Sequence, residues 1–307
     1  MDHGLPNTKN LLVIAGPTAS GKTAAAIRLA QHYKTVILSA DSRQFYREMA
    51  IGTAKPTQAE LAAAKHYFID SHSITDLFSV GDFEKQGLAL LYELFQTHDV
   101  VILVGGSGLY IKALCEGFDD IPQVDATIRE QLNNEFTEKG AAALQDELKA
   151  VDPAYYNEVD LQNPQRIIRA LEVYRNTGKP FSSFRKSTIN NRPFNILKIG
   201  LDLPREILYN RINLRVDDMI KQGLTNEVAN LIRYRDLNAL NTVGYRELFD
   251  YFDGKTDLTR AIELIKQNTR HFAKRQMTWF RKDKTIHWLH PDDIKPEIIT
   301  GLLNKVQ

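Results

Sequence analysis

The segment 16–23 constrains this chain most, because it fits the phosphate-loop pattern G-x-x-x-x-G-K-[ST]. The apolar run 11–15 precedes it, and the alanine-rich segment 24–30, which favours a helix, follows it. In this context, backbone N–H groups and the positive end of the helix dipole point at an anion. We therefore predict that a diphosphate or a nucleotide is bound by Gly16, Pro17, Thr18, Ala19, Ser20, Gly21, Lys22 and Thr23.

Two side chains of this loop have predicted roles of their own. Lys22 supplies a point charge to the phosphates, and Thr23 offers its hydroxyl to a magnesium ion. Mg²⁺ is therefore the expected cofactor, with Thr23 as a metal ligand. The pattern recognises linked phosphates, and it leaves open whether they belong to ATP.

Short apolar runs separated by helical patterns define the expected fold class. Each run is apolar on both faces, as in a strand that helices cover on both sides. We therefore predict an α/β fold, a P-loop-containing core with a doubly wound parallel sheet. The predicted strands are 11–15, 36–39, 100–104 and 196–201, and helical patterns between them include 21–32 and 82–97.

The pattern changes after Phe118, where helical signals replace strand signals up to about residue 195. Helices are expected at 125–150 and 164–176, between hinges at 119–122 and 190–193. We therefore predict three parts: a first part of the core at 1–118, a helical insertion at 119–194, and a mostly helical second part of the core at 195–307. Helices of that last part are expected at 204–234, 243–251 and 257–281.

The single cysteine, Cys115, excludes an internal disulfide framework and indicates a reducing compartment. Its apolar surroundings in the sequence predict a buried structural thiol. The chain has no apolar run of about 18 residues and no signal-peptide pattern, so a cytoplasmic protein without a membrane segment is expected. A net charge of +1 gives no global field that indicates nucleic acid, although a local basic patch can still bind it.

Asp41 follows the second predicted strand, and ligands of open α/β sheets bind at the carboxyl ends of strands. This placement suits a magnesium ligand or a general base beside the phosphate loop. A helix N-cap is the structural alternative. Arg43 and Gln44, close behind, have hydrogen-bonding side chains suited to a base edge or a phosphate.

The third predicted strand ends in Gly105, Gly106 and Ser107 rather than in the acid that motor ATPases usually carry there. The glycines permit close approach of the backbone to a ligand, and Ser107 can donate to a phosphate or a base. A tight structural turn explains the glycines equally well.

Two segments are strongly basic, namely 165–192 and 260–284, and aromatic residues lie within the second. Such helices can bind a polyanion backbone and stack bases, whereas the alternative is a solvated face with its aromatics packed inward. Arg211 and Arg215 lie four residues apart on a third predicted helix, where Arg215 can neutralise a leaving group or join a surface salt bridge.

Taken in order, several stretches resemble the tRNA dimethylallyltransferase (tRNA isopentenyltransferase) family of bacterial type. The resemblance covers about residues 10–290, and the combination of Asp-Ser-Arg-Gln with Ile-Gly-Thr-Ala-Lys-Pro is its most specific part. The stretches are 16–23, 41–44, 51–56, 104–110, 166–173, 215–219, 223–224, 243–245, 273–276 and 278–279.

This resemblance implies transfer of a dimethylallyl group from dimethylallyl diphosphate to N6 of an adenosine beside the tRNA anticodon, with Mg²⁺ and a helical insertion that grips the anticodon stem-loop. Asp41 would be the general base, and Thr23 and Arg215 would complete the catalytic set. A monomer is expected. The implied tRNA contacts are Asp41, Ser42, Arg43, Gln44, Ser107, Arg129, Gln165, Arg166, Ile167, Ile168 and Arg169.

Two other functions use the same motifs. A P-loop kinase would employ Asp41 as the base on a hydroxyl and ATP as the donor, but the two basic segments and the stretch 51–56 disfavour it. A non-catalytic RNA-binding NTPase is disfavoured by the glycines that end the third strand.

Overall fold

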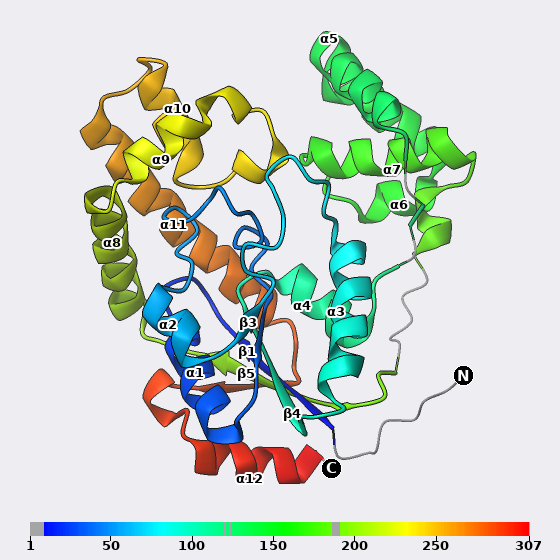
Figure 1. Ribbon diagram of the computed structural model, residues 1–307. Helices are drawn as coiled ribbons and strands as arrows, with labels where there is room; N and C mark the ends of the chain where they lie inside the picture. The colour runs from blue at the N-terminus through cyan, green and yellow to red at the C-terminus, as the bar shows by residue number, and fades with distance from the viewer. Residues whose placement is uncertain (1–8, 120, 123, 186–190, 307) are drawn as a thin grey trace. The chain divides into compact units, whose positions relative to one another are not determined.

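A six-stranded, fully parallel sheet forms the centre of the protein, with the strand order β3-β2-β4-β1-β5-β6 (Figure 1). The computed structural model describes residues 9–119, 121–122, 124–185 and 191–306. The strands are β1 (Asn10–Ala15), β2 (Ile37–Ser39), β3 (His66–Tyr67), β4 (Val100–Gly105), β5 (Asn195–Leu201) and β6 (Ile286–Leu289).

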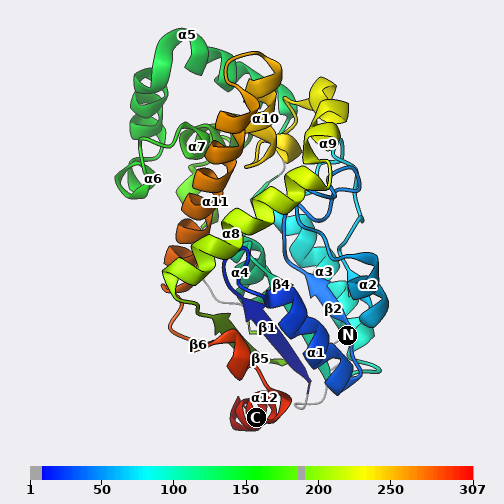
Figure 2. The ribbon, with the colours of Figure 1, turned by 90° about the vertical axis from the view of Figure 1, so that its left-hand side faces the viewer.

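Alternate side chains of the central strands enter two separate apolar cores, because successive residues of a strand point to opposite faces. Leu11 and Val13 pack with α3 (Val80–Leu94) and α4 (Gly108–Glu116) on one face. Leu12 and Ile14 pack with α1 (Lys22–Tyr33) and α12 (Pro296–Val306) on the other. Figure 2 shows the helices on the two sides of the sheet. The predicted doubly wound α/β fold is confirmed.

All four predicted strands are present within one residue of their expected bounds. The two edge strands were not predicted, because β3 has only two residues and β6 mixes apolar residues with His287. Four helices were not predicted either: α4, α12, α2 (Gln58–Ala63) and α6 (Pro153–Glu158).

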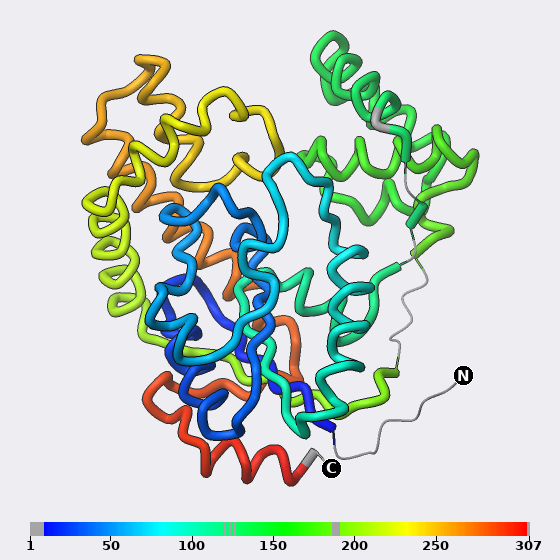
Figure 3. The backbone as a smooth tube through the Cα atoms, in the orientation of Figure 1, coloured from blue at the N-terminus to red at the C-terminus, as the bar shows by residue number. Residues whose placement is uncertain are grey.

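A second group of helices, from the C-terminal half, forms its own apolar core next to the loop that follows β2. The predicted single helix 204–234 is wrong, because Gly223 has φ of 99°, a left-handed conformation that ends a helix. The helices of this group are α8 (Arg205–Lys221), α9 (Leu224–Leu231), α10 (Tyr245–Phe252) and α11 (Leu258–Phe280). Blue N-terminal and yellow-to-orange C-terminal segments together build this part of the molecule (Figure 3).

Residues 117–190 form a separate compact unit, and the core unit consists of the chain up to Glu116 and from Asn191 on. The helical unit packs α5 (Ala126–Val151), α6 and α7 (Pro164–Thr177) around apolar side chains such as Leu144 and Leu171. Gly140, with φ of 78°, kinks α5. Of the predicted hinge residues, Asp120 and Asn190 lie outside the described residues.

Candidate active site

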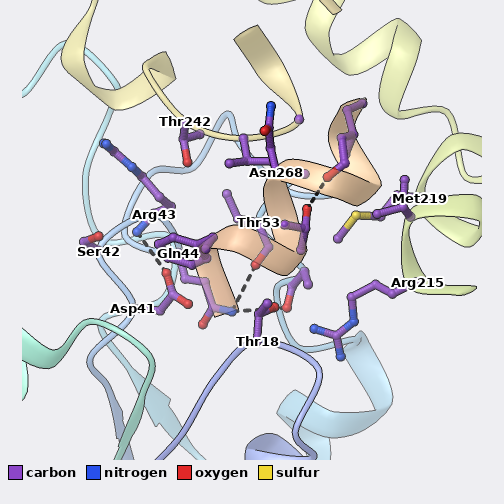
Figure 4. Close-up of a pocket in the computed structure, with 18 of the residues that line it drawn as sticks. Thr18, Asp41, Ser42, Arg43, Gln44, Thr53, Arg215, Met219, Thr242 and Asn268 are labelled. Atoms are coloured by element: carbon purple, nitrogen blue, oxygen red, sulfur yellow. Dashed lines mark hydrogen bonds between the residues drawn. The ribbon is translucent and has the colours of Figure 1, made fainter. Parts of the chain in front are cut away.

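A cavity of about 710 Å³ lies at the carboxyl ends of β1, β2 and β4. Side chains from the phosphate loop, from the end of β2 and from α8 face it, and Figure 4 shows Thr18, Asp41 and Arg215 around its lower part. The structure thus brings together the main residues predicted for the reaction centre. They are Lys22, Thr23, Asp41, Ser42, Arg43, Gln44, Ser107 and Arg215.

The phosphate loop runs from β1 into the N-terminus of α1. Gly21 has φ of 94° at the N-cap of α1, a conformation that favours glycine. The Lys22 ammonium donates a hydrogen bond of 2.7 Å to the carbonyl of Pro17. Burial, and to a smaller extent Arg215, lowers the pKa of Lys22 to about 8, although Asp41 opposes the shift. The Lys22 ammonium therefore loses its proton at a lower pH than an ordinary lysine does.

Asp41 follows β2, which is separated from β1 by β4 in the sheet. Its Oδ1 accepts a hydrogen bond of 3.2 Å from the backbone N–H of Arg43. Residues 42–45 form a turn, so Asp41 is not a helix N-cap. Burial raises the pKa of the Asp41 carboxyl, while the Arg43 N–H and the charges of Lys22, Arg43 and Arg215 oppose the rise. A raised carboxyl pKa makes a stronger base.

Ser107 and Gln44 form hydrogen bonds with the segments that lie around Asp41. Ser107 Oγ accepts a hydrogen bond of 3.0 Å from the backbone N–H of Ser42 and lies 3.2 Å from Ser42 Oγ. The Gln44 amide donates to the carbonyls of Thr53 and Ala54 at 3.2 and 3.1 Å, and its oxygen accepts from Ser39 at 3.1 Å. Both Gln44 protons are thus used inside the protein, which leaves only the second lone pair of its oxygen for a ligand.

Arg211 and Arg215 both face the phosphate loop from α8. Arg215 lines the cavity, and Arg211 Nη1 lies 3.8 Å from the position that a Cβ on Gly21 would take. Burial lowers the pKa of Arg215, against the charges of Glu60 and Asp41. Two cations from different helices thus line the cavity, Lys22 from α1 and Arg215 from α8.

Two residues that matter for the site had no predicted role. Gln276 on α11 accepts from the backbone N–H of Thr18 at 2.9 Å and donates to the carbonyl of Gly106 at 2.9 Å. Glu227 on α9 accepts from the backbone N–H groups of residues 50, 51 and 52 at 3.0, 2.7 and 3.0 Å. Both residues lie at least 170 positions along the chain from these backbone partners, and no spacing pattern connects them.

The oxygen donors at the loop suit a magnesium ion that a diphosphate helps to hold. The described residues contain no group of three or more His, Cys, Asp and Glu side chains able to bind a metal alone. Mg²⁺ commonly takes one or two protein oxygens and completes its shell with phosphate oxygens and water. Thr23 and Asp41, which line the same cavity, provide such oxygens.

The predicted tRNA contacts of the helical unit form a cluster on α7 and the start of α5. Arg129 is 3.2 Å from Glu172 and donates to Gln165 at 3.0 Å, and Arg169 pairs with Glu172. Gln165 and Arg166 are exposed. By contrast Ile167 and Ile168 are 1% and 0% exposed, so their side chains belong to the core of the unit. Of this predicted set, the polar members are the ones with exposed side chains.

The first basic segment, 165–192, has fewer unpaired positive charges than its sequence indicates. Acids from elsewhere in the chain pair with several of its arginines: Glu135 and Glu147 with Arg175, Glu158 with Arg185, and Glu84 with Arg192. The predicted basic residue Lys186 lies outside the described residues.

The second basic segment, on α11, keeps exposed aromatics. Phe272 and Trp279 are 40% and 41% exposed, so the alternative of inward-packed aromatics fails for these two, although Phe280 is buried. Phe272 and Arg275 line the cavity.

The predicted buried thiol is confirmed: Cys115 is 2% exposed, and burial raises its pKa to about 12.

Comparison with known proteins gives a consistent result. The family model "IPP transferase" matches residues 44–283. The chain is 54% identical over 296 residues to a tRNA dimethylallyltransferase of Christiangramia forsetii, covering 96% of this chain and 98% of the relative. It is 51% identical over 299 residues to the tRNA dimethylallyltransferase of Cytophaga hutchinsonii, covering 97% and 98%.

Solved structures agree. The crystal structure of the full-length tRNA isopentenylpyrophosphate transferase of Bacillus halodurans is similar with a TM-score of 0.71 and 36% identity, over 97% of both chains. A eukaryotic dimethylallyltransferase acting on tRNA shares the fold with a TM-score of 0.77 at 23% identity, over 97% of this chain and 79% of that one. None of the helices in the described ranges is long and apolar enough to cross a bilayer.

Proposed function

Because the chain belongs to the tRNA dimethylallyltransferase family, a family of prenyl-transferring enzymes, we propose a specific reaction for its cavity. The enzyme transfers a dimethylallyl group from dimethylallyl diphosphate to N6 of the adenosine 3′ of the anticodon in tRNA. Diphosphate is the leaving group. The observation that carries this proposal is the shared cavity, which places the phosphate-loop residues Lys22 and Thr23 together with the buried Asp41 and Arg215.

The diphosphate of the donor binds to the loop between β1 and α1. Backbone N–H groups at the start of α1 and the helix dipole favour an anion there. Lys22 on α1 and Arg215 on α8 neutralise the charge that grows on the leaving diphosphate. A magnesium ion held by Thr23, with Asp41 beside it, would supply further charge stabilisation to the diphosphate.

The acceptor nitrogen reacts beside Asp41. The N6 lone pair is delocalised into the adenine ring, so its attack creates a positive charge that must be relieved. The bond between the donor's C1 and the bridging oxygen breaks, the C1–N6 bond forms, and one N6 proton passes to the Asp41 carboxylate. Diphosphate departs with the electron pair of the broken bond. The raised pKa of Asp41 suits it to accept this proton.

The isoprenoid needs an apolar wall, and the side of the cavity formed by α8, α9 and α11 provides one. Met219 lies one turn beyond Arg215 on α8 and, in Figure 4, points into the cavity from above Arg215. With the diphosphate near Arg215, the dimethylallyl tail extends toward Met219. The apolar side chains of this wall are Val216, Met219, Leu224, Leu264 and Ile265.

The adenine enters a cavity that is closed by protein on several sides, so the base must leave the stack of the anticodon loop. Ser42, Arg43, Gln44 and Ser107 surround Asp41 and are the proposed contacts of this base and its neighbours. In the helical unit, Arg129, Gln165, Arg166 and Arg169 are the proposed contacts of the tRNA backbone.

One assay tests the reaction. The protein is incubated with unmodified tRNA and radiolabelled dimethylallyl diphosphate, and separately with γ-labelled ATP. Label in the tRNA from the prenyl donor only is the expected result. Transfer of label from ATP to a small acceptor, without prenylation, would instead support a P-loop kinase and refute the proposal.

A further inference from the structure

We propose that Gln276 is a positioning residue that fixes the spacing between the diphosphate loop and the loop that carries the base Asp41. This inference rests on the proposed function of the cavity and concerns a residue outside the set of reacting groups. Gln276 is only 7% exposed and lies on α11, which is distant in sequence from both loops.

The Gln276 amide joins the two halves of the site through both of its polar atoms. Its Oε1 accepts the backbone N–H of Thr18 in the diphosphate loop at 2.9 Å. Its Nε2 donates to the carbonyl of Gly106, directly after β4, at 2.9 Å. A side-chain amide offers both an acceptor and a donor, whereas a carboxylate cannot donate and a thioether does neither well.

The connection continues from Gly106 to Asp41. The neighbouring Ser107 donates its backbone N–H to the carbonyl of Ala40 at 3.3 Å, and its hydroxyl accepts the Ser42 N–H at 3.0 Å. Ala40 and Ser42 flank Asp41. A chain of hydrogen bonds therefore runs from the leaving-group loop through Gln276 to both neighbours of the base.

The Gln276 amide lies so close to Gly106 that no side chain fits there. A Cβ at Gly106 would lie 2.3 Å from Gln276 Nε2 and 3.5 Å from the carbonyl oxygen of Gly16. Gly106 does not adopt positive φ, so its lack of a side chain serves this close approach and not its backbone conformation. Glycine at 106 and the amide at 276 thus form one structural element.

Bond formation needs the departing diphosphate and the proton acceptor in a fixed relation, since small misplacements of reacting groups lower rates steeply. Loss of the Gln276 amide should therefore lower the rate of the chemical step, while each substrate still binds to its own loop. This pattern separates a positioning residue from one that binds substrate.

The test compares Gln276→Met with Gln267→Met, the same change at an exposed position of the same helix. The wild-type protein must first transfer the prenyl group, so that failure of the proposed function is recognised separately. Single-turnover rates are then measured, together with the dissociation constants of tRNA and of inorganic diphosphate. For Gln276→Met we expect a rate at least about tenfold lower, with both dissociation constants within about threefold of wild type.

A double-mutant cycle with Gly106→Ala supplies a second readout of the same contact. The methyl of Gly106→Ala displaces the amide, and Gln276→Ala vacates the space that the methyl needs. The double variant should therefore be no slower than the slower single variant. Fully multiplicative losses, a Gln276→Met rate within twofold of wild type, or a rate loss matched by equal loss of diphosphate binding would each overturn the proposal.

Discussion

Glu227 accepts a hydrogen bond of 2.6 Å from the hydroxyl of Tyr245, and the same carboxylate binds three consecutive backbone N–H groups of residues 50–52. Tyr245 is 0% exposed, and its ring leaves no space for a Cβ on Gly52, which would lie 2.5 Å away. The segment that follows residues 50–52 supplies the carbonyls of Thr53 and Ala54 to Gln44. Glu227 therefore anchors a wall of the cavity from α9.

The anchor predicts a stability effect. In Glu227→Gln an NH2 group replaces one of the two carboxylate oxygens. This NH2 group faces backbone N–H groups and cannot accept their hydrogen bonds. Leaving a buried donor unpaired costs about 1–3 kcal/mol, and these N–H groups are exposed or only partly buried, so we expect a loss of about 1 kcal/mol and a fall in Tm of about 2–4 °C. Glu93→Gln, at an exposed position of α3, should leave the Tm unchanged. Equal Tm values for the two variants would refute the anchor.

Lys22 predicts an alkaline limit of activity. Its ammonium must be protonated to bind the diphosphate, and burial lowers its pKa to about 8. Diphosphate affinity is therefore complete below that pH and decreases as the pH rises through about 8. In a profile from roughly pH 6 to 10, kcat/KM for the prenyl donor should show this limb, and the limb in kcat should lie higher, because bound diphosphate raises the pKa of Lys22.

The same experiment has a direct control. The guanidinium of Lys22→Arg stays protonated throughout this range, so any change in its inorganic diphosphate affinity comes from the ligand and the rest of the site, and the extra decrease near pH 8 should be absent. A wild-type profile with the same shape as that of Lys22→Arg across pH 8 would contradict the assignment of Lys22 to the diphosphate.

Arg215 predicts a loss of rate. Removal of one preorganised charge at a leaving group typically costs about 10²–10³ in kcat. Arg215→Met should show a loss of this order and Arg215→Lys a smaller one, because lysine keeps the charge without the planar fork. Arg205→Met, exposed at the start of the same helix, should retain wild-type kcat in steady-state assays. A kcat of Arg215→Met within a few-fold of wild type would remove Arg215 from the catalytic set.

Met219 predicts selectivity for prenyl length. Met219→Ala enlarges the apolar end of the cavity, so geranyl diphosphate should gain on dimethylallyl diphosphate by about tenfold or more in the ratio of kcat/KM. The control is Leu214→Ala, on the same helix but 57% exposed, which removes a similar volume from the surface and should leave this ratio unchanged. An unchanged ratio in Met219→Ala would place the isoprenoid elsewhere in the cavity.

The sequence predicts the parts of this fold that repeat a local pattern. Apolar runs identify four of the six strands, and the phosphate-loop motif identifies the turn into α1. The two edge strands carry too few apolar residues for such a pattern. Gly223 ends α8 through its backbone conformation, which a helical periodicity over 204–234 does not reveal.

The residues of the candidate site also form two groups, those that a sequence pattern identifies and those that it does not. Asp41, Lys22 and Arg215 follow from motifs and from the rule that ligands bind at strand ends. Gln276 and Glu227 work through hydrogen bonds to residues as far as 258 and 177 positions away along the chain, and only the folded structure pairs them with these partners. Similarly, a basic segment read alone does not show that Glu172 holds both Arg129 and Arg169.

The central claim is that Asp41 accepts the N6 proton while the neighbouring loop holds the diphosphate. Its most direct test is the single-turnover rate of prenyl transfer to tRNA by Asp41→Asn, measured beside the tRNA dissociation constant of the same variant. Loss of a general base lowers rates by about 10²–10⁴, so we expect a loss of this order with tRNA affinity within a few-fold of wild type. A transfer rate within a few-fold of wild type would contradict the account.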